Sequence, residues 1–381
     1  MKPAIIIHKR RPIVYALIKY ALIILMIGLM GCENKKPIKV GFVGCLTGRH
    51  SVLGSSGRDG VILAVETINK AGGINGRPIE LIIKDNRHDP EVAIQVDKEL
   101  INEGVVAIIG HMTSSMSIAV LPLINKEKIL IVSPTASTNK LTGIDDYFFR
   151  VTSPSINQTD HLARHSFKEM GLRNMAVVYD LSNRTFSEGL YNNFKSAFMS
   201  MGGTITSAET FLSGKEVAYL DLTKNLFNSE PDGLLIVASA LDTAMLCQQI
   251  RKLGSKIPLV SSAWAKTSDL IQHGGSAVEG IIFSSTYNKE SKHKNFVIFK
   301  KQYKERFGKI PDFSAVFSYE AAQLLFYGLS TTDEVEKLKD TIINRQIYPG
   351  LQGDIQIDKY GDVKRKRFLI TVKDGRLITL E

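Results

Sequence analysis

The sequence predicts an α/β fold made of two doubly wound parallel-sheet domains joined by a three-strand hinge. Short Val- and Ile-rich runs alternate with longer helical patterns, which is typical of parallel strands that are buried on both faces. This alternation begins near Pro37 and restarts after about Thr152, so the chain contains two units of similar plan. No low-complexity linker separates them, and we therefore expect several chain crossings between the units.

The first unit contains four expected strands and three expected helices. The strands are Lys39–Gly44, Pro78–Ile83, Val105–Gly110 and Leu130–Val132, and the helices are Gly60–Ala71, Pro90–Asn102 and Ser114–Lys126. Pro90 suits the first turn of a helix, where a backbone N–H has no intrahelical partner. We interpret Gly54-Ser55-Ser56-Gly57 as a flexible loop at the cleft, because the residues that would complete a phosphate-binding loop do not follow it.

The second unit repeats this plan, and the C-terminal part of the chain adds further elements to both units. Its expected strands are Asn174–Tyr179, Gly203–Glu209, Gly233–Val237, Leu259–Ser261 and Gly280–Phe283, with helices over Glu188–Met201, Ala218–Asn228 and Ala240–Leu253. Asn295–Asn344 has a helical pattern and Gly353–Glu381 has a strand pattern.

Three crossings between the units are expected, near Thr152–Pro154, Ser284–Tyr287 and Gly353–Gln356. They divide the chain into an N-terminal lobe (38–152 plus 286–353) and a C-terminal lobe (153–285 plus 354–381). Three crossings form a hinge that allows the lobes to close on each other.

The N-terminus has the features of an export signal. Residues 1–31 carry five Lys/Arg and no Asp/Glu, and Tyr20–Gly28 is apolar but too short to span a membrane. Leu29-Met30-Gly31-Cys32 resembles the bacterial lipobox, which predicts a signal peptide over 1–31, lipidation of Cys32 and a linker over 32–37. The alternative is an uncleaved signal anchor.

Net charge and cysteine spacing argue against a nucleic-acid-binding protein and against a metal or redox site formed by cysteines. The net charge of +10 falls to +5 without residues 1–31, and we interpret the basic run Lys364–Arg367 as a solvated face, so no nucleic-acid partner is expected. Cys45 and Cys247 show no metal or redox spacing and are expected to be two separate buried thiols, although one disulfide between them is an alternative.

No catalytic motif is present. The sequence contains no dinucleotide-binding loop and no nucleophile elbow. His161 and His165 share a predicted helix face, but no acid or third ligand lies nearby in sequence, so we expect a solvated face and no metal site. These observations predict a protein that is not an enzyme and uses no cofactor.

Several segments, in this order and spacing, carry a family resemblance. They are VGFVGCLTG (40–48), Gly54, Gly60, AVETIN (64–69), GGINGRPIEL (72–81), Lys84-Asp85-Asn86, Asp89-Pro90, GHMTSS (110–115) and SPTAS (133–137). With them, nearly all of residues 38–381 resembles the type I periplasmic binding proteins, in the group that binds branched-chain amino acids and amides.

The resemblance implies a function and partners. It implies an exported, lipid-anchored receptor of an ATP-binding cassette (ABC) importer, which binds a small amino acid, amide or related carboxylate in a cleft that closes on the ligand. The expected partners are this ligand, the permease and ATPase subunits, and the membrane through the lipid anchor, with the protein itself a monomer. The alternative is a sensory or chemotaxis component that docks on a separate membrane receptor.

Two loops of the N-terminal lobe are the first candidate ligand contacts. Thr113-Ser114-Ser115 follows one expected strand and opens a helix, so its hydroxyls and free N–H groups suit a carboxylate or carbonyl. Thr135-Ala136-Ser137 follows the next strand. The resemblance implies that the first loop binds the ligand's acid group and that the second binds its amine, although simple helix capping is the alternative for both.

The C-terminal lobe departs from the amino acid binders. The resemblance places Phe186 over the ligand, Ser239 where those binders often have Tyr, and Ala263 where they have a Glu that pairs with the ligand ammonium, followed by Trp264. Trp264 is expected either to stack on a flat ligand or to pack in the core. Because a buried, unpaired ammonium is costly, either the ligand lacks one or an acid substitutes, and the candidates are Asp180, Asp242 and Glu320.

Overall fold

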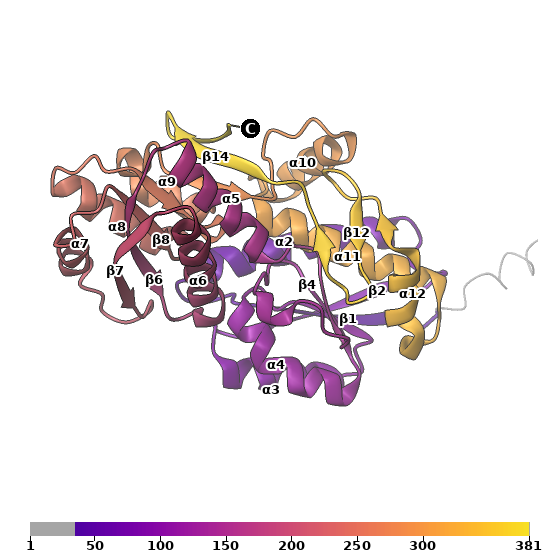
Figure 1. Ribbon diagram of the computed structural model, residues 1–381. Coiled ribbons are helices and arrows are strands. Elements are labelled where there is room, and N and C mark those ends of the chain that lie inside the picture. The colour runs from indigo at the N-terminus through magenta and orange to yellow at the C-terminus, as the bar shows by residue number, and fades with distance from the viewer. Residues whose placement is uncertain (1–34, 381) are drawn as a thin grey trace, which may run out of the picture.

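The computed structural model describes residues 35–380 and shows two α/β lobes side by side (Figure 1). The predicted signal peptide and the predicted lipidation site Cys32 lie outside the described residues. The N-terminal lobe is built on a five-stranded parallel sheet with the strand order β2-β1-β3-β4-β5. Its strands are β1 (Ile38–Gly44), β2 (Ile79–Asp85), β3 (Ala107–Ile109), β4 (Leu130–Ser133) and β5 (Phe148–Arg150).

Helices cover both faces of this sheet because successive side chains of each strand point to opposite sides. Val40 and Phe42 pack toward α2 (Ser51–Lys70) and α11 (Phe313–Thr331). Val43 and Ile108 pack toward α3 (Pro90–Asn102) and α4 (Ser114–Glu127) on the other face. The strands are therefore buried on both sides, as their continuous apolar runs predict.

The segment Gly54–Gly57 is helical, which corrects the flexible loop expected from the sequence. It lies within α2, where an added Cβ at Gly54 would be 2.0 Å from the Cys45 carbonyl oxygen. A Cβ at Gly60 would be 2.2 Å from the Ala315 carbonyl oxygen of α11. Glycine lowers the intrinsic stability of a helix by about 1 kcal/mol per residue. Here it allows α2 to approach the chain that follows β1 and helix α11 closely.

The C-terminal lobe is built on a seven-stranded sheet with the order β15-β14-β10-β9-β8-β6-β7. Its parallel part contains β6 (Asn174–Asp180), β7 (Thr204–Phe211), β8 (Gly233–Val237), β9 (Leu259–Ser261) and β10 (Ile282–Ser285). Two antiparallel strands extend one edge, β14 (Phe368–Lys373) and β15 (Arg376–Thr379).

Helices again lie on both faces of the second sheet. One face carries α5 (Ser155–Lys168) and α6 (Arg184–Ser200), and the other carries α7 (Tyr219–Phe227), α8 (Ala240–Lys252) and α9 (Ser268–Gly274). Cys247 in α8 and Cys45 in the other lobe are both buried, free thiols. None of the helices described between residues 35 and 380 is both long and apolar enough to cross a membrane.

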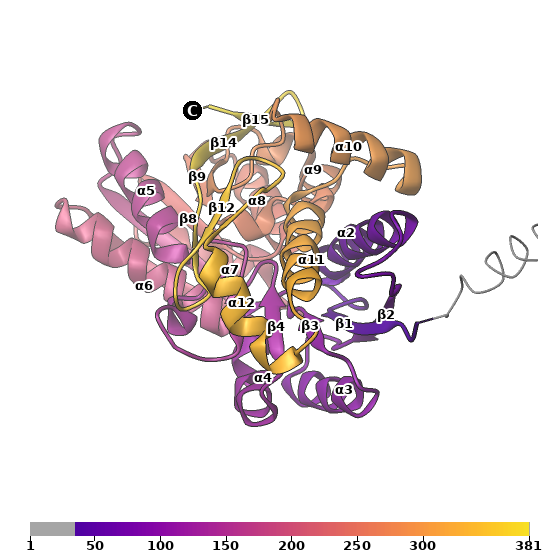
Figure 2. The same ribbon diagram turned by 90° about the vertical axis from the view of Figure 1, so that its right-hand side faces the viewer.

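The chain passes between the lobes three times. The first passage follows β5, and the second follows β10 and leads to α10 (Lys294–Phe307), α11 and α12 (Leu338–Arg345). The third lies between β13 (Val363–Lys364) and β14, later than the expected segment Gly353–Gln356. The cause is a small antiparallel sheet, in which β12 (Ile355–Ile357) pairs with β11 (Ile347–Tyr348) and β13 pairs with β12 before the chain leaves this lobe. Figure 2 shows β12 above α12.

Candidate ligand-binding site

A cavity of about 60 Å³ lies between the lobes, where loops after strands of both sheets meet. Such a position is where open α/β sheets bind ligands. Serine and threonine hydroxyls dominate its wall together with aromatic and aliphatic side chains. Within the described part of the chain, no Asp, Glu, Lys, Arg or His lines it. The cavity therefore offers neutral hydrogen-bonding groups and apolar surface to a small ligand.

The loops after β3 and β4 form the polar part of the N-terminal wall, and Leu53, Phe313 and Phe317 form its apolar part. Ser114, Thr135 and Ser137 line the cavity, together with Thr113. The Ser114 hydroxyl accepts a hydrogen bond of 3.2 Å from the backbone N–H of Thr138, and the Thr135 hydroxyl donates to the Met112 carbonyl. These bonds fix the two expected loops against each other.

Ser115 connects the two lobes. Its backbone N–H, in the first turn of α4, donates to Asn183 Oδ1 of the C-terminal lobe at 3.1 Å. Its hydroxyl accepts from the Thr185 N–H at 3.3 Å. Ser115 does not line the cavity, whereas Asn183 does. The lobes are thus in hydrogen-bonded contact beside the cavity.

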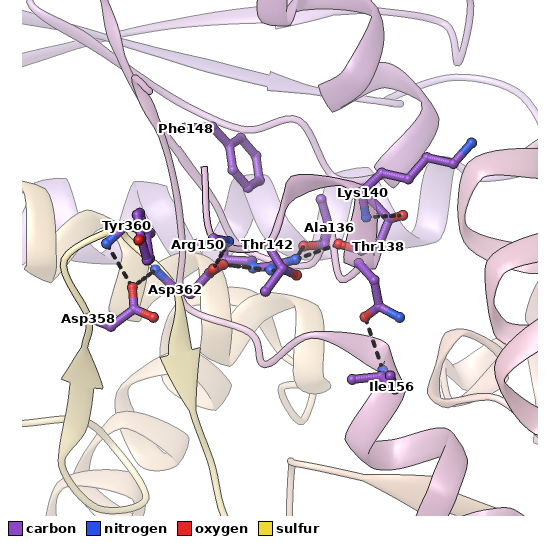
Figure 3. Close-up of polar contacts among 12 residues, drawn as sticks. Ala136, Thr138, Lys140, Thr142, Phe148, Arg150, Ile156, Asp358, Tyr360 and Asp362 are labelled. Atoms are coloured by element: carbon purple, nitrogen blue, oxygen red, sulfur yellow. Dashed lines mark hydrogen bonds and ion pairs between the residues drawn. The ribbon is translucent and has the colours of Figure 1, made fainter. Parts of the chain in front are cut away.

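Arg150, at the end of β5, supports the second loop from behind (Figure 3). Its side chain is fully buried and forms an ion pair with Asp362 at 2.5 Å. The guanidinium also donates to the carbonyl oxygens of Thr138 at 2.8 Å and Ala136 at 3.5 Å. Ala136 is buried behind the wall, and its carbonyl faces Arg150. Sequence reasoning missed Arg150, and a charged residue within the apolar run of β5 was the available signal.

Two aromatic residues form much of the C-terminal wall. Phe186 in α6 and Trp264 in the short helix η2 (Ala263–Ala265) line the cavity, and their ring centroids are 5.8 Å apart in an edge-to-face arrangement. Ala263 also lines it. An edge-to-face pair favours a fixed ring geometry, which gives the cavity a rigid apolar side.

Ser239 and the three candidate acids do not line the cavity. Ser239 caps α8 and donates to Asp242 Oδ2 at 2.6 Å, while Asp242 also forms an ion pair of 2.7 Å with Arg49. Asp180 accepts hydrogen bonds from Ser182 and Ser213, and burial raises the pKa of its carboxyl group. These acids are engaged with other protein groups.

Glu320 is engaged at the hinge instead of the cleft. It is fully buried, forms an ion pair of 2.6 Å with Arg365 and accepts the Leu351 N–H. Arg365 also donates to the Val151 carbonyl in the first crossing, and its backbone N–H donates to Ser153 Oγ at 2.8 Å. This cluster connects two of the three crossings. It leaves no carboxylate of Glu320 for a ligand in the cavity.

A row of hydroxyls on the C-terminal side was not anticipated. Ser261 ends β9, Ser284 and Ser285 end β10, and all three line the cavity with Ser262 and Thr286. The hydroxyls of Ser261 and Ser262 are buried and have no hydrogen-bond partner among the described residues. Open α/β sheets bind ligands at the carboxyl ends of their strands, and this principle, which predicted the N-terminal loops, also applies to these residues.

Two histidines lie where the lobes touch. The rings of His50 and His88 are 4.3 Å apart, and His50 is 5.5 Å from Trp264. His50 Nε2 is 3.3 Å from Ser182 Oγ of the C-terminal lobe. Burial lowers the pKa of each imidazole to about 4. No group of three metal-ligating side chains occurs in residues 35–380, and His161 in α5 lies 3.4 Å from Ser284 Oγ.

Known proteins share this architecture and sequence pattern. Residues 37–376 match the family described as periplasmic binding protein. The chain belongs to this family. A curated relative is the leucine-, isoleucine-, valine-, threonine-, and alanine-binding protein of Pseudomonas aeruginosa, which is 23% identical over 342 residues that cover 87% of this chain and 89% of the relative.

Solved structures agree with the two-lobed architecture of this periplasmic binding protein. A leucine binding protein from Thermotoga maritima MSB8 has a TM-score of 0.84 and 26% identity, with 90% of this chain and 98% of that chain covered. A solute binding protein of an ABC transporter from R. palustris, solved in complex with benzoate, has a TM-score of 0.82 and 20% identity, with 90% and 95% covered. These matches confirm the type I fold and the family expected from the sequence.

Family membership also fixes the general character of the protein. It is a periplasmic binding protein, and its curated relatives are solute-binding proteins and not enzymes. The family implies an exported protein.

Proposed function

We propose that this protein is the extracytoplasmic receptor of an ABC importer and binds a small amino acid, amide or carboxylate in the cavity between its lobes. The observation that carries the proposal is the cavity itself, which lies at strand ends of both lobes and combines hydroxyl groups with an aromatic side. The benzoate complex of the R. palustris relative supports including carboxylates beside amino acids.

The proposed mechanism is hinge closure. The ligand first binds the N-terminal lobe at Ser114, Thr135 and Ser137. The C-terminal lobe then brings Phe186 and Trp264 over it. The ligand stabilises the closed state because only that state offers both walls, and the permease and ATPase complex recognises the closed state. Contacts such as Ser115 to Asn183 support closure as a discrete packed arrangement.

The anchor completes the proposal. Lipid on Cys32 holds a monomeric receptor at the membrane, and two or three acyl chains give stable attachment where one chain does not. Cys32→Ser is expected to release the protein from the membrane fraction into the soluble fraction, as measured by fractionation of expressing cells.

A thermal-shift screen of the purified protein tests ligand binding. The panel contains branched-chain amino acids, short amides, and aliphatic and aromatic carboxylates. A ligand that binds only the folded state stabilises it and so raises the melting temperature. At a ligand concentration of 100 times Kd, the added free energy of unfolding is about 2.7 kcal/mol. Trp264→Ala is expected to abolish the shift, while Ile310→Ala, at an exposed site outside the cavity, keeps it. The absence of any shift across the panel would contradict the proposal.

A further inference from the structure

Lys266 is a buried cation next to the cavity that the function proposed above does not use. It follows η2 and is only 4% exposed. Its ammonium donates to Ser285 Oγ and lies 5.6 Å from the ring of Tyr287 and 5.8 Å from the ring of Phe313. In the described part of the chain it forms no ion pair with a carboxylate. A buried charge without a counter-charge costs free energy, so an anion bound near Lys266 would stabilise its charged form.

Ser285 connects this cation to the ligand space. Ser285 and Phe313 both line the cavity. The Ser285 oxygen accepts from Lys266 and also from the Tyr287 N–H at 3.0 Å, so both of its acceptor positions are used. Its own hydrogen points to the Tyr287 carbonyl at 3.2 Å. Toward a ligand this hydroxyl can therefore act only as a donor, and a carboxylate oxygen is a stronger acceptor than a carbonyl.

The other charged groups near Lys266 do not neutralise it by direct contact. Asp312 draws the pKa of Lys266 upward, but burial outweighs this and lowers that pKa to about 7. The Asp312 carboxylate is engaged by Ser56 Oγ at 2.7 Å and the Ala315 N–H at 3.1 Å, and burial raises its pKa while Lys309 opposes the rise. Burial also raises the pKa of the Tyr287 phenol, which donates to the Pro311 carbonyl.

We propose that Lys266, acting through Ser285, selects carboxylate ligands that lack an α-ammonium group over zwitterionic amino acids. An α-ammonium would bring a second positive charge into a cavity whose described lining contains no acid. Asp180, Asp242 and Glu320 are held by other groups and do not line the cavity. This inference rests on the proposed function, because it names the class of ligand that the same cavity binds.

The test compares matched ligands by isothermal titration calorimetry. The pairs are 4-methylpentanoate against leucine and benzoate against benzamide, measured with the wild type, Lys266→Met and the exposed control Lys252→Met. The wild type and Lys252→Met are expected to bind each carboxylate at least tenfold more tightly than its partner. In Lys266→Met, the ratio of carboxylate affinity to partner affinity is expected to fall about tenfold, and the affinity for benzamide is expected to change little.

Proton uptake separates a selective role from a structural one. At pH 7.5, carboxylate binding to the wild type is expected to take up protons, because the anion favours the charged form of Lys266. The uptake is measured in two buffers with different ionisation enthalpies, and Lys266→Met should not show it. This measurement needs only the wild type, so it still decides the matter if the variant does not fold: carboxylate affinity should fall as pH rises from 7 to 8.5, and benzamide affinity should not.

Three results would overturn the inference. An equal loss of carboxylate and amide binding in Lys266→Met would show that Lys266 only supports the local structure. Tighter binding of leucine than of 4-methylpentanoate to the wild type would remove the selectivity but leave the proposed receptor function intact. Failure of every ligand in the panel to bind would contradict the proposed function as well.

Discussion

The two walls of the cavity are built by different means. The N-terminal wall contains short loops directly after β3 and β4, and the buried Arg150 holds one of them from behind. Leu53 of α2 and Phe313 and Phe317 of α11 add apolar surface to this wall. The C-terminal wall consists of the Phe186–Trp264 pair and a row of hydroxyls, while the carboxylates of that lobe turn inward to protein partners. The difference shows that position at a strand end brings a residue near the ligand. Its tertiary partners decide whether its polar group remains available.

Removal of Arg150 should have the largest effect on the N-terminal wall. Arg150→Met leaves Asp362 as a buried, unpaired carboxylate and frees the carbonyls of Ala136 and Thr138. Breaking one side of a buried pair typically costs about 3–5 kcal/mol. We expect a loss of this size in the free energy of unfolding, measured by urea denaturation, together with weaker ligand binding.

Arg164→Met is the matched control for Arg150→Met. Its guanidinium forms an exposed ion pair with Asp160 at 2.9 Å within α5. Exposed pairs of this type contribute less than about 1 kcal/mol. If the two variants lost similar stability, the account of Arg150 as a buried support of the loop would be wrong.

The contact between the walls should weaken as pH falls. Burial holds the pKa of His50 at about 4, against the ordinary value of 6.5. Asp242 opposes this shift and Arg49 adds to it, and the neighbouring His88 is also held at about 4. The unfolded chain therefore binds a proton below pH 6.5 that the folded protein rejects. The contribution of His50 to the free energy of unfolding is fully present above pH 6.5. It is lost as the pH falls from 6.5 to 4, and the loss is on the order of 2–3 kcal/mol.

His50→Gln removes this titration and should flatten the pH dependence. The free energy of unfolding is measured at pH 7.5, 6.0 and 5.0 for the wild type, His50→Gln and the exposed control His273→Gln. The difference between the wild type and His50→Gln should shrink as pH falls, whereas His273→Gln should follow the wild type. A constant difference across this range would refute the assignment to His50.

The sequence was sufficient to predict the fold because its main signal is local. Val- and Ile-rich strands and the helix start at Asp89-Pro90 follow from neighbouring residues, and the Asp89 side chain does accept from the first N–H groups of α3. The start of α2 was missed because Gly54 and Gly57 weaken a helical pattern. Glycine is needed at these positions because the helix contacts the chain after β1 closely at Gly54 and contacts Met112 and Ser318 closely at Gly57. Met112 and Ser318 lie far away in sequence.

The candidate site was only partly predictable for the same reason. The loops with Ser114 and Ser137 could be placed at the cavity from strand ends alone. Asp242 was expected near the ligand, but it is surrounded by Arg49, Ser213 and Tyr219, and no local pattern shows these partners. Lys266 was missed because a lysine in a polar segment carries no sign of burial, which arises only when β10 and α11 pack beside it.

Two serine variants give the smallest and sharpest comparison of the walls. The Ser137 hydroxyl lines the cavity and has no hydrogen bond to another described residue, so Ser137→Ala should weaken ligand binding about fivefold, the value of one hydrogen bond, with little loss of stability. Ser239 caps α8 and contacts Asp242, so Ser239→Ala should cost about 1 kcal/mol in the free energy of unfolding and leave affinity unchanged. Calorimetric titration and urea denaturation of both variants measure the two quantities. A reversed pattern, with Ser239→Ala losing affinity, would mean that this capping serine reaches the ligand in the bound state and that the inward-turned network of the C-terminal wall rearranges on binding.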